Sequence, residues 1–436
     1  MLVRKMAYKR YEVALALALL IVAGLAVRAL PLAIGAWDPD AYYHERIVGQ
    51  TITSGLPTVD ALSWGGRTYS YYPLAHLAPA AIAVLLGIDA REAIIFVNLL
   101  LALAGLLALY ALAKKWLGAE AAFWALAAAA LLPAFVARGS LLARPEALAF
   151  ALAPAALLLV GNRAALFALF FFGALYHLPT TLGILLLVVL IKALERCVAW
   201  GALAGAIAGI IVYGRAGALV EAASTQLFRL SSESLPFDFV SLLFLLGALL
   251  VFAFAGWRAL GDRRIALWCL MAFAAALFAG RNIVLLAPAI AVLIGGGVVE
   301  AKKKARKYSV LVAPLFVIAA VASFLLFASW VSPAFLPQDF RAAEWAGGRG
   351  VVASWWDRGH LLTFYGAPVV ADGFFEGAPD AEARIAVLNR LMATGTEAAL
   401  IELNASLVFI DSRAGFDSSE LNRVFDSGAR VFSKRD

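Results

Sequence analysis

The chain alternates long apolar stretches with short polar segments over most of its length. Apolar runs of about 15 to 23 residues recur from Tyr11 to Trp330, and a helix needs about 20 such residues to cross a bilayer. We therefore predict about 11 to 13 membrane-spanning helices. Those assigned fall near residues 11–34, 92–112, 119–137, 146–161, 163–177, 179–193, 197–213, 237–256, 264–279, 281–297 and 308–330.

The remaining stretch, residues 331–436, has the more polar pattern of a water-soluble domain. Apolar side chains recur at helical spacing in one part of it and form continuous strand-like runs in others. The predicted strands or extended segments are 351–356, 368–371 and 407–410, and the predicted helices are 360–365 and 379–392. We therefore expect an α-helical membrane domain, 1–330, followed by one small layered α/β domain, 331–436.

The composition agrees with this division. Hydrophobic residues make up 64% of the chain, charged residues make up 15%, and the mean hydropathy is +0.88. No soluble core could hide so much apolar surface. The formal charge of +7 comes from short basic loops between apolar runs, so it indicates topology and excludes a nucleic-acid partner.

The basic loops also predict orientation. Counted from a basic, cytoplasmic N-terminus, every strongly basic loop falls on the cytoplasmic side, as the positive-inside rule requires. An odd number of spans then places residues 331–436 outside the plasma membrane, together with the loops 35–91, 138–145 and 214–236. Residues 74–88 are apolar but short, and we expect them to form a helix at the outer interface.

The predicted outer loops hold four carboxylates suited to a divalent metal. Asp38 and Asp40 follow the first span closely. Glu146 lies at the edge of the second loop, and Glu233 lies near the end of the third. Such hard oxygen ligands bind Mg²⁺ or Mn²⁺, which neutralise phosphate oxygens. The plain structural readings are a helix cap with a solvated loop for Asp38 and Asp40, a helix start for Glu146 and an ordinary loop before a helix for Glu233.

Two further segments are candidates for binding. The Trp-Trp-Asp-Arg-Gly run, residues 355–359, leaves a predicted strand, and neighbouring side chains of a strand point to opposite faces. One of the two tryptophans should therefore line a surface pocket, unless the pair packs against the membrane interface. Arg281 opens a late apolar run, where its guanidinium could hold a phosphate or reach the lipid headgroups.

Together these segments resemble the catalytic subunit of oligosaccharyltransferase, the family that includes bacterial PglB and archaeal AglB, and the chain resembles a short archaeal AglB-like member. Residues 355–359 are similar to the Trp-Trp-Asp-Tyr-Gly signature of the family, with Arg358 in the tyrosine position. The stretch 365–373 is similar to the continuation of that signature. This tryptophan motif is the specific part of the resemblance.

Other segments match the family in the same order along the chain. Asp38-Pro39-Asp40 is similar to its first-loop Asp-X-Asp. Glu233 fits a loop motif that begins with a hydroxyl residue, although Leu230 stands at that position here. Arg281 matches an arginine that family members use on the pyrophosphate of the lipid-linked donor.

The resemblance implies a GT-C type membrane fold and a single-subunit enzyme. Such an enzyme moves an oligosaccharide from a dolichyl phosphate or pyrophosphate in the membrane to asparagine in Asn-X-Ser/Thr of an acceptor polypeptide, with Mn²⁺ or Mg²⁺ as cofactor. The residues implied are Asp40, Glu146 and Glu233 in catalysis, the same three with Asp38 as metal ligands, Arg281 at the donor pyrophosphate, and Trp355, Trp356 and Asp357 at the acceptor hydroxyl.

One departure keeps other functions open. Arg144-Pro145-Glu146 has a cation where the family has the first acid of its second motif, so either Glu146 and Asp38 complete the metal shell or the chain is a catalytically impaired paralogue. A related enzyme that transfers a monosaccharide from a polyprenyl phosphate would leave the tryptophan motif without a role. A transporter would carry ionisable residues inside its spans, whereas the acids of this chain cluster in the predicted outer loops. Arg144 is the best argument for a non-catalytic scaffold or acceptor-binding subunit.

Asn404-Ala405-Ser406 is a glycosylation sequon in the predicted outer domain. It is either a site of self-glycosylation or a turn before the strand 407–410. The small number of thermolabile residues points to a thermophilic archaeon as source.

Overall fold

The computed structural model divides the chain into two compact units. We call them the helical unit, which comprises Met1–Ala36, Ile95–Tyr213 and Ser232–Ser332, and the α/β unit, which comprises Trp37–Ile94, Gly214–Ser231 and Pro333–Asp436. The residues that the structure describes are 15–27, 37–69, 71–136, 144–192, 199–213, 247–258, 263–278, 282–329, 333–374, 378–416 and 418–435.

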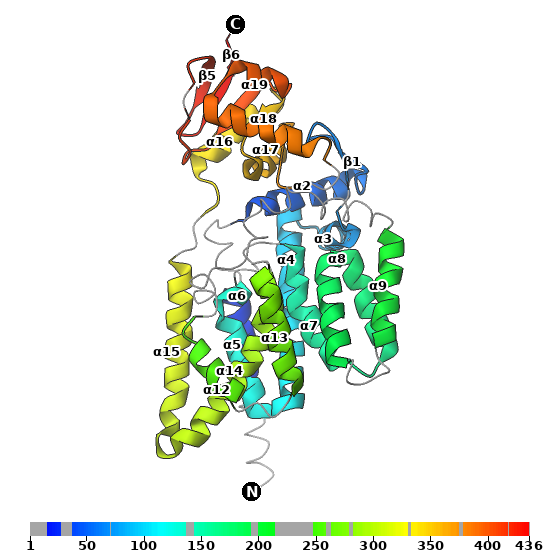
Figure 1. The fold of residues 1–436 in the computed structure, drawn as a ribbon, viewed down its shortest axis with the longest axis vertical. Helices are drawn as coiled ribbons and strands as arrows, with labels where there is room; N and C mark the ends of the chain where they lie inside the picture. Colours follow the sequence, from blue (N-terminus) through cyan, green and yellow to red (C-terminus); the bar gives the residue numbers. More distant parts are fainter. Residues whose placement is uncertain are drawn as a thin grey trace. The chain divides into compact units, whose positions relative to one another are not determined.

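Long apolar helices build the helical unit (Figure 1). Their sequences are rich in alanine and leucine, which have high helix propensity. In chain order the described helices are Leu15–Val27, α4 (Ala90–Leu117, which begins in the α/β unit), α5 (Ala119–Leu131), α6 (Pro133–Val136), η2 (Pro145–Ala147), α7 (Leu148–Leu158), α8 (Arg163–Lys192), α9 (Ala199–Tyr213), α12 (Leu250–Arg258), α13 (Arg263–Phe278), α14 (Ile283–Ala305), η6 (Arg306–Tyr308) and α15 (Ser309–Ala328).

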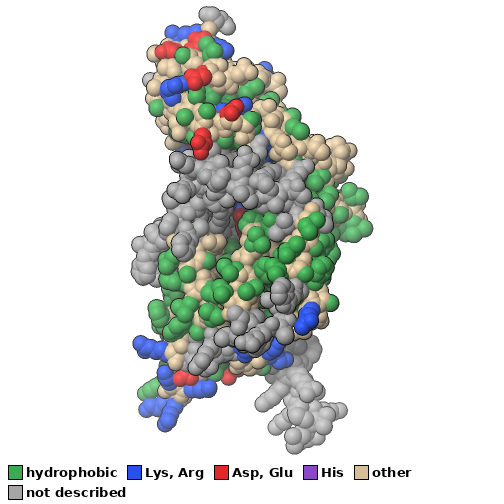
Figure 2. All heavy atoms as spheres, turned by 45° about the vertical axis from the view of Figure 1, so that its right-hand side comes forward, with side chains coloured by type: hydrophobic (Ala, Val, Ile, Leu, Met, Phe, Trp, Pro, Cys, Tyr) green, Lys and Arg blue, Asp and Glu red, His purple; other side chains and the backbone are tan. Residues whose placement is uncertain are grey.

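Among the described residues, three helical stretches are long and apolar enough to cross a bilayer: Ala90–Leu117, Arg163–Leu190 and Ile283–Ala328. Hydrophobic side chains cover much of the surface of this unit, and Lys and Arg side chains gather at one end of it (Figure 2). These observations support a membrane protein. The predicted orientation and the outer position of residues 331–436 stay predictions.

The helix α8 contains two of the predicted spans. Its backbone leaves helical geometry at His177, where φ is −160° and ψ is 96°. Pro179 lies two residues beyond this point, and a proline inside a helix removes a hydrogen-bond donor and clashes with the preceding turn. The division expected between 163–177 and 179–193 is therefore present as a break within one long helical segment.

The α/β unit is built around a small sheet with strand order β3-β4-β6-β5. β3 and β4 are parallel, and the other neighbouring strands are antiparallel. Its elements are α2 (Pro39–Ser54), β1 (Val59–Asp60), β2 (Arg67–Thr68), α3 (Pro73–Leu86), α16 (Pro337–Ala346), β3 (Val352–Ala353), η7 (Trp356–Arg358), α17 (Gly359–Phe364), α18 (Ala381–Thr394), α19 (Glu397–Glu402), β4 (Leu407–Ile410), β5 (Leu421–Asp426) and β6 (Arg430–Lys434).

Most of the elements predicted for residues 331–436 are present. α17, α18 and β4 match the predicted helices and the predicted buried strand, and Val369 forms a parallel bridge with Val352 in the expected extended segment. The expected strand 351–356 was too long, because the chain turns into η7 at Trp356. α3 is the helix expected at 74–88.

Residues of the first loop complete the core of the α/β unit. Trp64 is fully buried in the same hydrophobic cluster as Leu388, Leu391 and Val408. Its backbone oxygen accepts a 2.7 Å hydrogen bond from Arg384 Nη1. The segment 37–94 is therefore part of the same folded body as 333–436, and α2 packs on α17.

Candidate functional site

Asp38 and Asp40 lie at the start of α2. Asp38 is the N-cap residue, and its Oδ1 accepts a 3.0 Å hydrogen bond from the backbone N–H of Asp40, as capping aspartates commonly do. Pro39 occupies the first helical turn, where its missing N–H costs nothing. The cap fixes the backbone of Asp40, whose side chain is 25% exposed.

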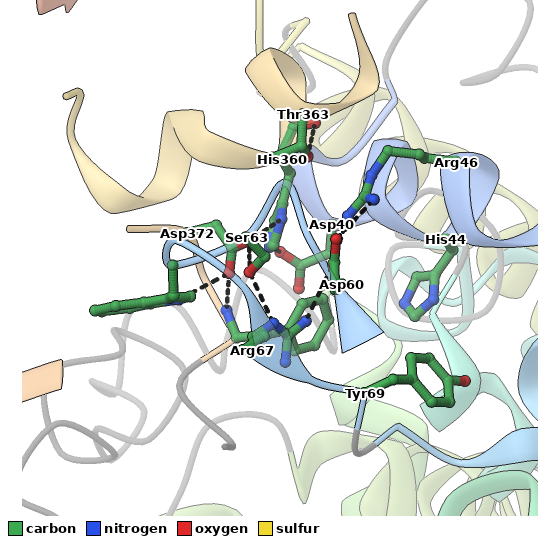
Figure 3. A network of polar contacts seen from close by, with 12 residues as sticks. Asp40, His44, Arg46, Asp60, Ser63, Arg67, Tyr69, His360, Thr363 and Asp372 are labelled. Carbon is green, nitrogen blue, oxygen red and sulfur yellow. Dashed lines mark hydrogen bonds and ion pairs between the residues drawn. The ribbon is translucent and has the colours of Figure 1, made fainter. Parts of the chain in front are cut away.

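The imidazole of His360, at the start of α17, lies between two carboxylates (Figure 3). Its Nε2 is 3.5 Å from Asp40 Oδ1, and its Nδ1 is 3.9 Å from Asp372 Oδ2. His360 is completely buried, and neither ring nitrogen has a hydrogen-bond partner among the described residues. Gly373 has no side chain beside this pair, and a Cβ there would lie 2.8 Å from His360 Nε2 and 3.6 Å from Asp40 Oδ1.

Asp372 is a buried carboxylate held firmly in place. It accepts hydrogen bonds from the Ser63 hydroxyl, from Trp64 Nε1 at 3.1 Å and from the Phe374 backbone N–H at 3.0 Å. Burial by itself would raise the pKa of Asp372, but the nearby charge of Arg67 and these hydrogen bonds hold it below its usual value. The group is therefore a fixed negative charge behind His360.

Two arginines balance the buried charge around this site. Arg46 makes a two-pronged contact with Asp60, with Nη1 2.9 Å from Oδ1 and Nη2 2.6 Å from Oδ2. Arg67 donates from Nε to Ser63 Oγ at 2.7 Å and lies 3.8 Å from Asp60. Burial lowers the pKa of His360 to about 4, and Arg67 and Arg46 act in the same direction.

The tryptophan motif follows β3 in the same unit. Trp355 is 37% exposed, whereas Trp356 packs against the hydrophobic core of the α/β unit. Asp357 is 42% exposed, and its Oδ2 lies 3.0 Å from Arg358 Nη1. Arg358 Nε also donates to Asp411 Oδ2 at 2.9 Å. Burial raises the pKa of Asp357, against the opposing effect of Arg358.

The remaining predicted site residues lie elsewhere or outside the described residues. Glu146 is in η2 of the helical unit, and its Oε2 is buried without a hydrogen-bond partner in the described part of the chain. Glu233 and Arg281 lie outside the described residues. No group of three or more His, Cys, Asp or Glu side chains among the described residues is arranged to hold a metal ion.

The site still contains features that fit a divalent ion. Asp40 offers a partly exposed carboxylate, and beside it lies His360 Nε2, a buried nitrogen with no hydrogen-bond partner in the described part of the chain. Gly373 has only a hydrogen atom where another residue would place a Cβ close to both groups. Sequence reasoning did not select His360 or Asp372, although both lie next to segments that carry the family resemblance. The contact with Asp40 crosses most of the chain and has no local sequence signal.

No protein-family model matches the chain, and no curated protein matches its sequence. Its structure is similar to solved membrane glycosyltransferases. The oligosaccharyltransferase of Archaeoglobus fulgidus in its apo form has a TM-score of 0.70 and 13% identity, over 93% of this chain and 70% of that one. The AglB protein of the same organism, in complex with an inhibitory peptide and a dolichol-phosphate, has a TM-score of 0.63 and 15% identity. The match again covers 93% of this chain and 70% of that one.

ArnT of Cupriavidus metallidurans, bound to undecaprenyl phosphate, has a TM-score of 0.56 and 16% identity, over 97% of each chain. A further structure of the A. fulgidus enzyme holds zinc and sulfate. At these identities the likeness shows the fold. The predicted fold class, a GT-C type helical membrane domain followed by a small α/β domain, is confirmed.

Proposed function

We propose that the chain is an oligosaccharyltransferase that moves a glycan from a polyprenyl phosphate or pyrophosphate to asparagine in Asn-X-Ser/Thr. One observation carries the proposal: Asp40 of the first loop lies 3.5 Å from His360, which directly follows the tryptophan motif 355–359, inside one compact unit. The likeness to the A. fulgidus enzyme supports it, because that protein was also solved with a tethered acceptor peptide containing the NVT sequon.

In this mechanism Asp40 accepts hydrogen bonds from the acceptor amide. Holding the amide N–H groups against a fixed carboxylate twists the C–N bond and frees the nitrogen lone pair for attack on the sugar. Glu146 and Glu233 would share this role, and Arg281 would hold the departing phosphate through paired hydrogen bonds. Each of these assignments predicts that the neutral variant of the residue lowers kcat.

Trp355, Trp356 and Asp357 would bind the Ser or Thr hydroxyl two residues after the acceptor. The exposed Trp355 ring offers an apolar wall, and Asp357 offers a carboxylate oxygen to the hydroxyl. A site built to bond a hydroxyl rejects acceptors without one, because its own polar groups would be left unpaired. The proposed pocket therefore accounts for a Ser/Thr requirement.

Asp40, Asp38, Glu146 and Glu233 would hold Mn²⁺ or Mg²⁺, which would supply positive charge to the leaving phosphate. Asp38 fits this role less well than Asp40, because one of its oxygens already caps α2. We also propose that the α/β unit and the acceptor site lie outside the cell membrane, that the N-terminus is cytoplasmic and that one chain suffices for activity.

A second candidate is a related enzyme that transfers a single sugar from a polyprenyl phosphate. The observation that favours it is the likeness to ArnT, which extends over 97% of both chains. Arg144, in place of an acid, favours the further possibility of an impaired paralogue.

The deciding experiment is transfer of a lipid-linked oligosaccharide to a fluorescent peptide. The purified chain is given Asn-X-Thr or Asn-X-Ala peptides in Mn²⁺ and then in EDTA. We expect metal-dependent transfer to the Thr peptide alone. If a verified native donor gives no transfer to the Thr peptide, and a single sugar is instead transferred to another acceptor, the second candidate would replace the proposal.

A further inference from the structure

The sequon Asn404-Ala405-Ser406 joins the end of α19 to β4. The side chains of Asn404 and Ser406 are exposed, and neither makes a hydrogen bond with any residue that the structure describes. Ala405 between them is 2% exposed and belongs to the hydrophobic core of the α/β unit. The amide and the hydroxyl that define an acceptor sequon are therefore at the surface, while the residue between them is fixed.

The end of α19 explains the backbone of Asn404 but not the two polar side chains. Asn404 has a φ of 51°, and its N–H and that of Ala405 donate to the carbonyl oxygens of Ile401 and Leu400, at 2.9 and 3.1 Å. Helices commonly end at such a left-handed residue, which is usually glycine and sometimes asparagine. This cap uses main-chain atoms alone, so it requires neither an amide at 404 nor a hydroxyl at 406.

In the folded unit the backbone of the sequon is held against its neighbours. The N–H groups of Ser406 and Leu407 both donate to the Val351 carbonyl oxygen, at 2.8 and 3.1 Å, and Ala405 is in the core. An acceptor site that binds both the amide and the hydroxyl two residues later must surround this segment. The segment can enter such a site only after local opening of the unit, which costs free energy. A folded chain is therefore a poor acceptor at Asn404.

The same contact connects the sequon to the tryptophan motif. Val351 leads into β3, whose Val352 pairs with Leu407 of β4, and residues 355–357 follow β3 closely. Release of the sequon removes the strand pairing that positions these residues. A chain whose sequon is free to act as an acceptor thus lacks its own ordered tryptophan motif, and the enzyme must be another copy.

We propose that Asn404 is a glycosylation site, modified by a second, folded copy of this chain before the α/β unit of the acceptor chain has folded. The inference rests on the proposed function for the activity, the donor and the side of the membrane. Asn404 Nδ2 forms a bond with the anomeric carbon of the glycan, and the bond from that carbon to the phosphate oxygen breaks. The electron pair leaves with the phosphate, and the amide nitrogen loses one proton to solvent.

The test follows Asn404 by mass spectrometry in a host that contains the lipid-linked donor and no other enzyme of this kind. A tagged chain with Asp40→Asn, which lacks the carboxylate proposed to hold the acceptor amide, is produced alone or together with the untagged wild type. We expect glycan on Asn404 of the tagged chain only when the wild type is present. Ser406→Ala in the tagged chain is the matched control and should abolish this modification, since the sequon is lost while the core residue Ala405 is kept.

A second measurement needs no variant and stays decisive if Asp40→Asn does not fold. The wild-type chain is purified from cells that lack the donor, so that Asn404 is unmodified, and is then given the donor with a peptide of residues 398–412. We expect transfer to this peptide. Asn404 of the folded chain should be modified at least about 100-fold more slowly, because a folded domain exposes its buried segments in only a small fraction of molecules.

The outcomes separate this inference from the proposed function. Unmodified Asn404 in the tagged chain beside active wild type, with transfer to an Asn-X-Thr peptide intact, would overturn the glycosylation site and leave the proposed function standing. Glycan on the tagged chain produced alone would overturn the role of a second copy, and equal rates for the folded chain and the peptide would overturn modification before folding. Absence of transfer to every peptide would overturn the proposed function and this inference together.

Discussion

Arg358 occupies the position where the tryptophan motif differs from the signature it resembles, and its side chain contacts two carboxylates. Its Nη1 lies 3.0 Å from Asp357 Oδ2, and its Nε lies 2.9 Å from Asp411 Oδ2. Asp411 also accepts the backbone N–H groups of Arg413 and Ala414. Asp411 is therefore a fixed anchor, and through Arg358 it restricts the rotation of Asp357.

This geometry predicts that Arg358→Lys weakens acceptor binding more than it slows catalysis. Lysine keeps the charge but lacks the planar fork that reaches both carboxylates. We expect the KM for an Asn-X-Thr peptide to rise about 10-fold with kcat nearly unchanged, and Asp411→Asn to act in the same direction. Arg413→Lys is the control, because that side chain donates to the Pro333 carbonyl instead. An equal KM in all variants would contradict the positioning role.

Buried and exposed ion pairs of the α/β unit should differ in their effect on stability. Asp60 is 1% exposed and accepts hydrogen bonds from Nη1 and Nη2 of Arg46. The Asp60→Asn variant therefore leaves a buried cation without its charged partner. We expect a loss of about 3–5 kcal/mol in the free energy of unfolding, measured by denaturant titration of tryptophan fluorescence. Glu402→Gln breaks the exposed pair with Arg390 and should cost less than about 1 kcal/mol. Equal losses would show that burial of the Asp60 pair is unimportant.

At the scale of elements, small residues let α14 pack closely against its neighbours. A Cβ on Gly297 would collide with the Phe252 carbonyl oxygen of α12, and a Cβ on Gly295 would collide with the Ala121 carbonyl oxygen of α5. Gly296, on the same helix, would place a Cβ 3.4 Å from a Leu117 methyl group. Close helix contacts through glycine are typical of membrane bundles.

The prediction is that Gly297→Ala and Gly296→Ala differ sharply. Gly297→Ala forces α12 and α14 apart, and overpacking of this kind costs about 1–3 kcal/mol or more. Gly296→Ala should be neutral or slightly stabilising, since alanine is favoured over glycine in helices by up to about 1 kcal/mol. Thermal unfolding in detergent compares the two. A comparable melting temperature for both variants would argue against close packing of α12 and α14.

The elements that the sequence predicted correctly are those with a strong local pattern. α18 places Ile385, Leu388, Leu391 and Met392 on one buried face, and such spacing is readable from sequence. β5 was missed because its residues are mostly exposed and do not alternate. The predicted strand at 351–356 was too long because the local turn at η7 overrides the strand-like composition of the tryptophans.

At the scale of the whole molecule, the first loop and the C-terminal residues share one core. Trp64 is fully buried, and its Nε1 donates to Asp372. Trp64→Ala in the full chain should lower the stability of the α/β unit by about 3–5 kcal/mol, detected as faster proteolysis of that unit. Trp345→Ala is the control, because this half-buried ring stacks on Phe425 near the surface. Equal resistance of the two variants to proteolysis would contradict a core role for Trp64.

The site could be predicted from sequence only in its separate halves. Asp40 and the Trp355 to Asp357 run were selected because each belongs to a short motif. The contacts that join the halves, from Ser63 and Trp64 to Asp372 and from His360 to Asp40, link positions more than 300 residues apart. Such pairing follows from the packing of α2 on α17 and leaves no periodicity in the sequence.

The shared core also has a consequence for the order of synthesis. Ser63 leaves the ribosome 309 positions ahead of its partner Asp372, a delay of roughly 15 to 60 seconds at usual elongation rates of about 5–20 residues per second. During that interval the indole of Trp64 has no core to enter, which makes it a natural contact for a chaperone. A nascent chain that stops before α17 would carry Asp40 but not His360. The proposed catalytic centre would thus be assembled only after α17 has been translated.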